Sequence, residues 1–176
     1  MNNKTLVVSM FGGPGSGKST MTSRVFAELK DLGINCEIAS EYAKDATWQK
    51  SFHILSNQLY IFAKQQHRIW RLDGQVDVIL TDSPLLNSVI YGSDKSTDLF
   101  KALVYEEHSK RPKLDIFLKR VKKYNPSGRS QTEDEAKELD ILIHKVVPSF
   151  DLEVNGEKES ASIIVEKILE TINKLK

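Results

Sequence analysis

Residues 12–19 read GGPGSGKS, and an apolar run, residues 6–11, comes directly before them. The order G-x-x-x-x-G-K-[ST] between a strand and a helix is typical of a loop that cradles phosphates. Its glycines let successive backbone N–H groups converge on phosphate oxygens, and the positive N-terminal end of the following helix faces the same anion. The segment therefore predicts a nucleoside-triphosphate site.

The residue types in this loop have separate chemical roles. Lys18 supplies a mobile cation for the β- and γ-phosphates, and Ser19 offers a hydroxyl ligand to Mg²⁺. A chance glycine-rich turn is the alternative, but the strand before the loop and the helix after it argue against that interpretation. ATP and Mg²⁺ are the cofactors that the pattern implies. The predicted nucleotide contacts are Gly13, Pro14, Gly15, Ser16, Gly17, Lys18, Ser19 and Thr20.

Apolar periodicity alternates between the strand and the helix period along the chain. It predicts strands near residues 6–11, 34–40, 76–82, 114–118 and 152–154. It predicts helices near residues 18–32, 55–69, 97–107, 139–146 and 164–175, with an irregular stretch at 43–50. This alternation predicts an α/β fold with a mostly parallel sheet. Because the sequence contains no repeat or linker, we expect one domain over residues 1–176.

The charge balance argues against partners that need a strong field. The 176 residues carry 25 Lys and Arg against 24 Asp and Glu, a formal net charge of +1. Nucleic acid is therefore a less favoured partner than a small molecule, and we expect no membrane. The single cysteine, Cys36, cannot form an internal disulfide, so we expect a cytoplasmic protein. An exposed apolar helix face would allow a homodimer, which periodicity alone leaves open.

Two carboxylates follow predicted strands. Asp82 ends the run VILTD, and Glu41 follows the run IAS. Ligands bind at the carboxyl ends of parallel strands, so Asp82 is predicted to hold the Mg²⁺ water shell beside Ser19. Glu41 is predicted to accept the proton of an attacking hydroxyl. The alternatives are a simple turn at Asp82 and a solvated helix start at Glu41. Ser83 follows Asp82 where a motor ATPase would carry a glutamate.

A basic segment, LKRVKKYNPSGR, precedes the spacing of a capping box at Thr132 and Glu135. Phosphoryl transfer spreads negative charge over the γ-phosphate oxygens, and a positioned arginine stabilises that charge. We therefore expect a small lid at about residues 120–133, with Arg120 and Arg129 as catalytic residues. The alternative is a basic loop that ends in a helix cap.

The sequence offers only candidates for the acceptor pocket. Tyr42 and Trp48 would stack on a base, although each is more often a core residue. Gln66 is the polar member of an apolar helical stripe and would hydrogen-bond to a base edge. A buried amide that the backbone satisfies would give the same pattern.

The motifs GGPGSGKST, SEYA, FAKQQ and TDSPLL, in that order, resemble P-loop kinases that include the nicotinamide-riboside kinase domain and related phage and bacterial ATP-binding proteins. The order of parts is also similar to deoxyribonucleoside kinases. The resemblance implies a three-layer P-loop kinase fold, with a parallel five-stranded sheet flanked by helices and a small lid. It places Glu41 at the base position, Asp82 at the acidic site, and Arg120 and Arg129 in the lid.

The resemblance also implies an activity, transfer of the ATP γ-phosphate with Mg²⁺ to a nucleoside, nucleotide or related ribosyl molecule. Ser83 stands where deoxyribonucleoside kinases commonly carry an arginine, and Tyr42 follows Glu41 where they carry proline, so the acceptor stays open. A polynucleotide or modified-base DNA kinase is the second hypothesis. A regulatory NTPase is the third, weakened because no N-K-x-D motif follows the loop.

Overall fold

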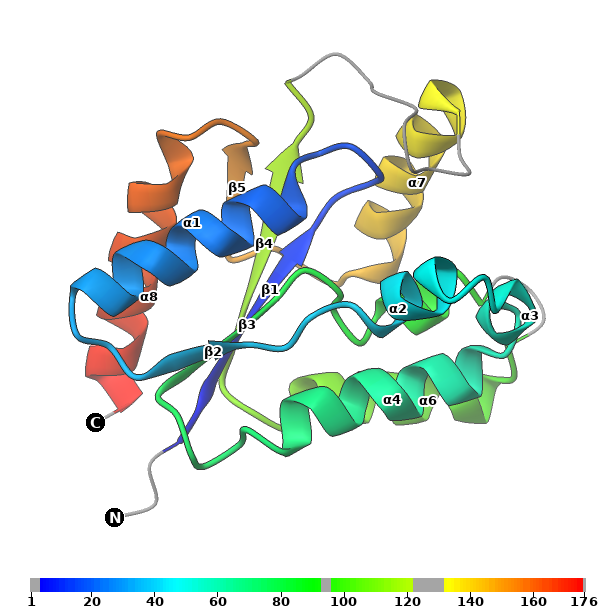
Figure 1. The fold of residues 1–176 in the computed structure, drawn as a ribbon, viewed down its shortest axis with the longest axis horizontal. Coiled ribbons are helices and arrows are strands. Elements are labelled where there is room, and N and C mark those ends of the chain that lie inside the picture. Colours follow the sequence, from blue (N-terminus) through cyan, green and yellow to red (C-terminus); the bar gives the residue numbers. More distant parts are fainter. Residues whose placement is uncertain (1–3, 93–95, 122–131, 176) are drawn as a thin grey trace.

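Five parallel strands form the sheet at the centre of the computed structural model, which describes residues 4–92, 96–121 and 132–175 (Figure 1). The order across the sheet is β2-β3-β1-β4-β5, and every neighbouring pair is parallel. The prediction of an α/β fold with a five-stranded parallel sheet is confirmed. The strands are β1 (Leu6–Phe11), β2 (Cys36–Ile38), β3 (Val78–Thr81), β4 (Lys113–Lys119) and β5 (Leu152–Asn155).

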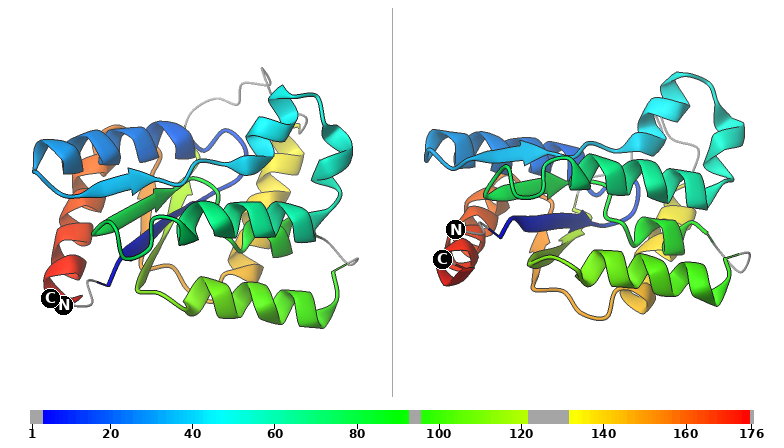
Figure 2. Two further views of the ribbon diagram at one scale, coloured as in Figure 1. Left: turned by 60° about the horizontal axis from the view of Figure 1, so that its bottom comes forward. Right: turned by 90° about the horizontal axis from the view of Figure 1, so that it is seen from below.

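Helices cover both faces of this sheet. Figure 1 and Figure 2 show α1 and α8 on one face and α4, α6 and α7 on the other, with α2 and α3 beyond the end of the sheet. The molecule is therefore built of three layers, as predicted. The helices are α1 (Lys18–Asp31), α2 (Tyr42–Trp48), α3 (Phe52–Leu55), α4 (Gln58–Trp70), α5 (Asn87–Ile90), α6 (Asp98–Ser109), α7 (Glu133–Val146) and α8 (Ser160–Leu175).

The central strand β1 is apolar on both faces because each face meets a helical layer. Leu6, Val8 and Met10 pack in the cluster formed with α1 and α8. Val7 and Phe11 point the other way, into the cluster formed with α4, α6 and α7. This period of two places successive side chains of β1 on opposite faces of the sheet.

Two predicted helix boundaries are confirmed by their caps. Gly33, at φ 75°, follows α1, and its N–H donates to the carbonyl of Lys30 at 2.9 Å. At the start of α7, the Thr132 hydroxyl accepts from the Glu135 N–H and the Glu135 carboxylate accepts from the Thr132 N–H. The predicted capping box therefore forms.

The prediction of an irregular stretch at residues 43–50 was wrong, because α2 spans Tyr42–Trp48. Of its seven residues only Ala46 is buried, so the helix has no apolar face that periodicity would reveal. Its helical conformation follows instead from the chain that packs around it. Helix α2 contacts both α3 and α4.

The predicted apolar stripe of residues 55–69 is only partly buried in the structure: Phe62 and Ile69 are buried as expected. Leu55 belongs to α3, and α4 begins after Asn57, whose side chain accepts from the Tyr60 N–H. Leu59 is 61% exposed. The residues of α4 that are buried are Ile61, Phe62, Gln65 and Ile69.

None of the helices in the described part of the chain is long and apolar enough to cross a membrane.

Candidate active site

The site lies at the carboxyl edge of the sheet, where β1 is flanked by β3 on one side and β4 on the other. Chain connections diverge at such a point, and ligands of open α/β sheets bind there. The loop of residues 12–19 leaves β1 at this edge and enters α1, whose first residue is Lys18.

Gly12 at the start of the loop has φ 141°, a conformation that favours glycine. A Cβ atom there would lie 2.6 Å from the Ser16 hydroxyl and 2.9 Å from the carbonyl oxygen of Leu118. The turn therefore needs glycine for its backbone conformation and for its close contact with β4.

Lys18 curls back over the loop. Its Nζ donates to the carbonyl oxygens of Gly12 at 2.6 Å and of Gly13 at 3.3 Å. Burial lowers the pKa of the Lys18 ammonium, while the carboxylates of Glu41, Asp82 and Asp140 act in the opposite direction. The cation is thus held at the loop and surrounded by acidic groups.

Ser19 and Asp82 meet at the edge of the sheet. The Ser19 hydroxyl donates to Oδ2 of Asp82 at 2.6 Å. The other carboxylate oxygen, Oδ1, is buried and has no hydrogen-bond partner among the described residues. A hydroxyl and a carboxylate are oxygen ligands of the kind that Mg²⁺ prefers. This pair fits the predicted metal site.

Glu41 emerges from the neighbouring strand. The N–H of Ala39 donates to the Leu80 carbonyl and the Thr81 hydroxyl donates to the Ala39 carbonyl, each at 2.9 Å, so the ends of β2 and β3 run together. Burial raises the pKa of the Glu41 carboxyl, and the charge of Asp82 raises it further, whereas Lys18 lowers it. Glu41 therefore shares one electrostatic environment with the phosphate loop and the acidic site.

Arg120 follows β4 and reaches the same loop. Its guanidinium donates to the carbonyl oxygens of Pro14 and, at 3.2 Å, Ala136, and to the Asp140 carboxylate at 2.9 Å. Asp140 is a site residue that the sequence interpretation missed. Arg129 and most of the predicted lid lie outside the described residues.

The three predicted acceptor contacts lie in different places. Tyr42 directly follows Glu41 in the sequence. Its hydroxyl donates a hydrogen bond to the hydroxyl of Tyr60 at 3.2 Å. Trp48 is at the far end of α2 and 78% exposed, so it is not a core residue. Gln66 donates to Glu107 of α6 at 3.3 Å, between two helices and not beside the phosphate loop.

Gln65, the residue before Gln66, has its side-chain amide at the ends of β2 and β3, next to the site. It is buried, its Oε1 accepts from the Tyr42 N–H at 3.0 Å, and its Nε2 lies 3.5 Å from the Ala39 carbonyl and 3.4 Å from the Thr81 hydroxyl. It therefore fastens the ends of β2 and β3 to the start of α2. The predicted stripe shares Phe62 and Ile69 with the buried face of α4, but that face carries Gln65 where the stripe has Gln66.

Tyr91 is a third residue that the sequence did not predict, because it follows the unpredicted short helix α5. Tyr91 as a whole is 43% exposed, yet partial burial of its phenol, with the charges of Glu41 and Asp140, raises its pKa to about 12. The phenol therefore belongs to the same group of side chains as the two carboxylates and stays protonated at neutral pH.

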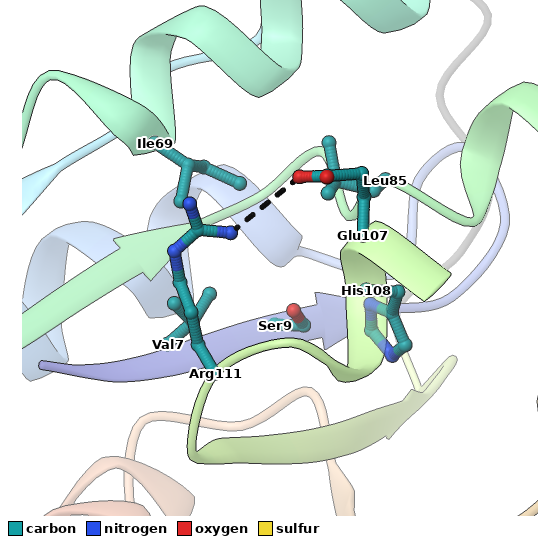
Figure 3. Close-up of a pocket in the computed structure, with 7 residues that line it drawn as sticks. All are labelled: Val7, Ser9, Ile69, Leu85, Glu107, His108 and Arg111. Atoms are coloured by element: carbon teal, nitrogen blue, oxygen red, sulfur yellow. Dashed lines mark ion pairs between the residues drawn. The ribbon is translucent and has the colours of Figure 1, made fainter. Parts of the chain in front are cut away.

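A separate pocket lies against the middle of β1, under α4 and α6 (Figure 3). Arg111 covers it and pairs with Asp73 at 2.6 Å and Glu107 at 3.9 Å. Beside it His108 lies 3.0 Å from Asp115. Burial alone would raise the pKa of Asp115, but the hydrogen bonds from His108 and Lys113 hold it below its ordinary value. The pocket is thus closed by paired charges and is not part of the phosphate site.

The model of one protein family, described as an AAA domain, matches residues 7–160. The chain belongs to this AAA domain family. A search of curated proteins finds no match for it.

Solved structures show how widely this AAA domain shares its fold. NadR protein in complex with NR is similar at a TM-score of 0.67 and 14% identity, over 92% of this chain and 51% of NadR. Thymidylate kinase from Candida albicans is similar at 0.60 and 15% identity, over 97% of this chain and 93% of the kinase. The Mycobacterium tuberculosis APS kinase CysC is similar at a TM-score of 0.55 and 16% identity, over 95% of this chain and 99% of the kinase. The AAA domain therefore has the fold of the P-loop kinases.

Proposed function

We propose that this AAA domain is a single-domain kinase that transfers the γ-phosphate of ATP, with Mg²⁺, to a nucleoside, nucleotide or related ribosyl small molecule. The observation that carries the proposal is the position of Glu41, whose carboxyl is close enough to Lys18 and Asp82 for both charges to shift its pKa. A switch protein or a motor has no need for a base at the end of β2. A kinase needs one beside the phosphate that it transfers.

The residues of the loop would bind the triphosphate. The backbone N–H groups before α1 and the Lys18 ammonium would hold the phosphate oxygens. Ser19 and Asp82 would hold Mg²⁺, which neutralises charge on the β- and γ-phosphate oxygens when it is bound. The Ser19 hydroxyl donates its proton to Asp82 Oδ2, so the lone pairs of its oxygen are available to the ion while that hydrogen bond is kept.

In the transfer step, Glu41 would act as the general base. The acceptor oxygen would attack the γ-phosphorus, the bond from that phosphorus to the leaving oxygen of ADP would break, and the hydroxyl proton would pass to the Glu41 carboxylate. Arg120, and Arg129 of the predicted lid, would stabilise the charge on the transferred group. A phosphate acceptor is already ionised and needs no base, so the role of Glu41 favours a hydroxyl acceptor.

A screen of ATP consumption would test the proposal. Nucleosides, nucleoside monophosphates, nicotinamide riboside and short oligonucleotides would each be offered with MgATP, and the phosphorylated product would be identified by mass spectrometry. We expect a nucleoside-like hydroxyl compound to stimulate turnover. Stimulation by oligonucleotides alone would favour a polynucleotide kinase, and no stimulation by any compound would argue against a kinase.

A further inference from the structure

The Asp140 carboxylate, on α7, contacts the phosphate loop directly. Its Oδ1 accepts a hydrogen bond from the backbone N–H of Gly13 at 2.5 Å, across 127 residues of sequence. Its Oδ2 accepts from the Arg120 guanidinium at 2.9 Å. The two side chains are largely buried, at 22% exposure for Asp140 and 10% for Arg120. Both oxygens of the carboxylate are therefore used within the site.

Arg120 completes the contact from the opposite side. One guanidinium nitrogen donates to the carbonyl of Pro14, the next residue of the loop, and the other also donates to the carbonyl of Ala136 on α7. Two consecutive loop residues are thus held, Gly13 through its N–H by Asp140 and Pro14 through its carbonyl by Arg120. We call these two side chains the Arg120–Asp140 pair.

The fit of Gly13 against α7 shows how close this contact is. A Cβ atom on Gly13 would lie 2.6 Å from the Ala136 carbonyl oxygen, 2.8 Å from Asp140 Oδ1 and 2.9 Å from an Arg120 nitrogen. These distances are shorter than van der Waals contact. Only a residue without a side chain lets α7 approach the loop this closely.

The charges explain why a carboxylate sits so near a phosphate site. Arg120, left without a partner, would lie buried beside the loop at a cost in free energy, and Asp140 offsets that charge. The charge-assisted bonds also fix the planar guanidinium in one orientation. Asp140 further contributes to the electrostatic environment of Lys18. Asp140 therefore orients the Arg120 guanidinium at the loop.

We propose that Asp140 is a positioning residue of the ATP site: with Arg120 it holds Gly13 and Pro14 in the phosphate-binding conformation, and so links ATP affinity to the position of α7. This inference rests on the proposed function for the ATP site itself. It assigns no contact between Asp140 and the nucleotide. Arg120 directly follows β4 and Asp140 lies on α7, so the Arg120–Asp140 pair connects the end of β4 and helix α7 to the loop.

Equilibrium binding of a non-hydrolysable ATP analogue with Mg²⁺, by calorimetry, tests the inference without an acceptor. Asp140→Ala is expected to raise the dissociation constant about 10- to 100-fold, as expected for lost hydrogen bonds to charged groups. Asp140→Asn keeps an oxygen for the Gly13 N–H and loses the ion pair, so its effect is expected to be smaller. Glu138→Gln, an exposed change on α7, is the matched control and is expected to bind as the wild type does.

Two further measurements separate positioning from general stability. The double variant Arg120→Gln with Asp140→Ala is expected to bind no more weakly than the worse single variant, because both belong to one contact. Once an acceptor is known, the KM for ATP is expected to rise in Asp140→Asn while the KM for the acceptor stays constant, a split that mere loss of stability would not give. Folded Asp140 variants that bind the analogue as tightly as wild type would overturn the inference alone. A wild-type chain that binds no analogue would overturn the ATP site and the inference together.

Discussion

The hydroxyl of Ser19 and the carboxylate of Asp82 are joined by a 2.6 Å hydrogen bond across 63 residues, and the second oxygen of Asp82 is buried with no partner in the described part of the chain. A buried carboxylate oxygen without a partner costs free energy unless something binds it. The pair is therefore arranged as one side of a cation site, with the remaining ligands to come from phosphates and water.

Asp82→Asn is expected to weaken Mg²⁺ binding more than it lowers the stability of the fold. The amide keeps the shape of the side chain but loses its charge, so the Mg²⁺ concentration that gives half-maximal turnover should rise about 10- to 100-fold, as for other groups that orient metal ligands. A Mg²⁺ titration at saturating ATP measures this. Asp31→Asn, exposed on the helix that carries Ser19, is the control. An unchanged Mg²⁺ requirement in Asp82→Asn would remove Asp82 from the metal site.

Lys18→Ala is expected to abolish phosphoryl transfer and leave the fold intact. Burial lowers the pKa of this ammonium, because removing a charge from water costs free energy. Removal of the side chain should therefore not lower the melting temperature. The control is Lys30→Ala, an exposed change on the same helix that removes surface contacts to Glu37 and to the Phe26 ring. Turnover and thermal melting are both measured on the two variants. Retained turnover in Lys18→Ala would refute the assignment of the phosphate loop.

Sequence patterns predicted the strands, the long helices and the phosphate loop because these depend on local periodicity and on a motif with fixed spacing. The run of residues 6–11 is apolar except for Ser9 because β1 is covered on both faces. Glu41 and Asp82 were predicted because the carboxyl ends of parallel strands meet at one edge of the sheet. This rule can be applied without knowing which residues are in contact. The sequence therefore predicted those parts of the candidate site that directly follow the strands.

Asp140, Tyr91 and Gln65 could not be found in this way. Asp140 meets Gly13 through a contact that spans 127 residues. The sequence of α7 contains several acidic residues, and no local pattern distinguishes Asp140 from the others. Gln65 and Gln66 are adjacent, and the choice between them depends on the rotation of α4. That rotation is set by packing against the sheet, where Ile61 and Ile69 are buried and Leu59 is exposed.

Gly13→Ala is expected to weaken nucleotide binding. The new Cβ would meet a backbone oxygen of α7 at 2.6 Å, so the loop or the helix must move. Overpacking of this kind costs about 1–3 kcal/mol, which urea denaturation would measure alongside analogue binding. Gly33→Ala is the control, since it is strained by its φ of 75° but meets no atom and lies away from the site. If Gly13→Ala bound the analogue as wild type does, α7 would not restrain the loop.

Glu41→Gln is expected to lower kcat by about two to four powers of ten, because the amide cannot accept the proton of the acceptor hydroxyl. The KM for ATP should change little, since the loop residues remain. Glu37→Gln, an exposed change on β2, is the control and should keep full turnover. A near-normal kcat in Glu41→Gln would show that another group, or no group, takes the proton.

The raised pKa of Glu41 also predicts how stability depends on pH. Burial and Asp82 favour the neutral carboxyl in the folded chain, so its contribution to stability is full below the unfolded value of about 4.3 and is lost as pH rises through the folded value. Gln at this position does not titrate. The free energy of unfolding of Glu41→Gln should therefore increase relative to wild type between about pH 4 and pH 7.

Urea denaturation of both proteins across that range measures the difference, with Glu37→Gln as a variant whose difference from wild type should not follow this trend. The acid limb of kcat/KM should likewise lie above the ordinary glutamate value of about 4.3, since the base must be ionised to act. A stability difference that is constant, or that shrinks as pH rises, would mean that the Glu41 carboxyl is not held in its neutral form. The electrostatic argument for Glu41 as the base would then fail, even if the fold and the phosphate loop are as described.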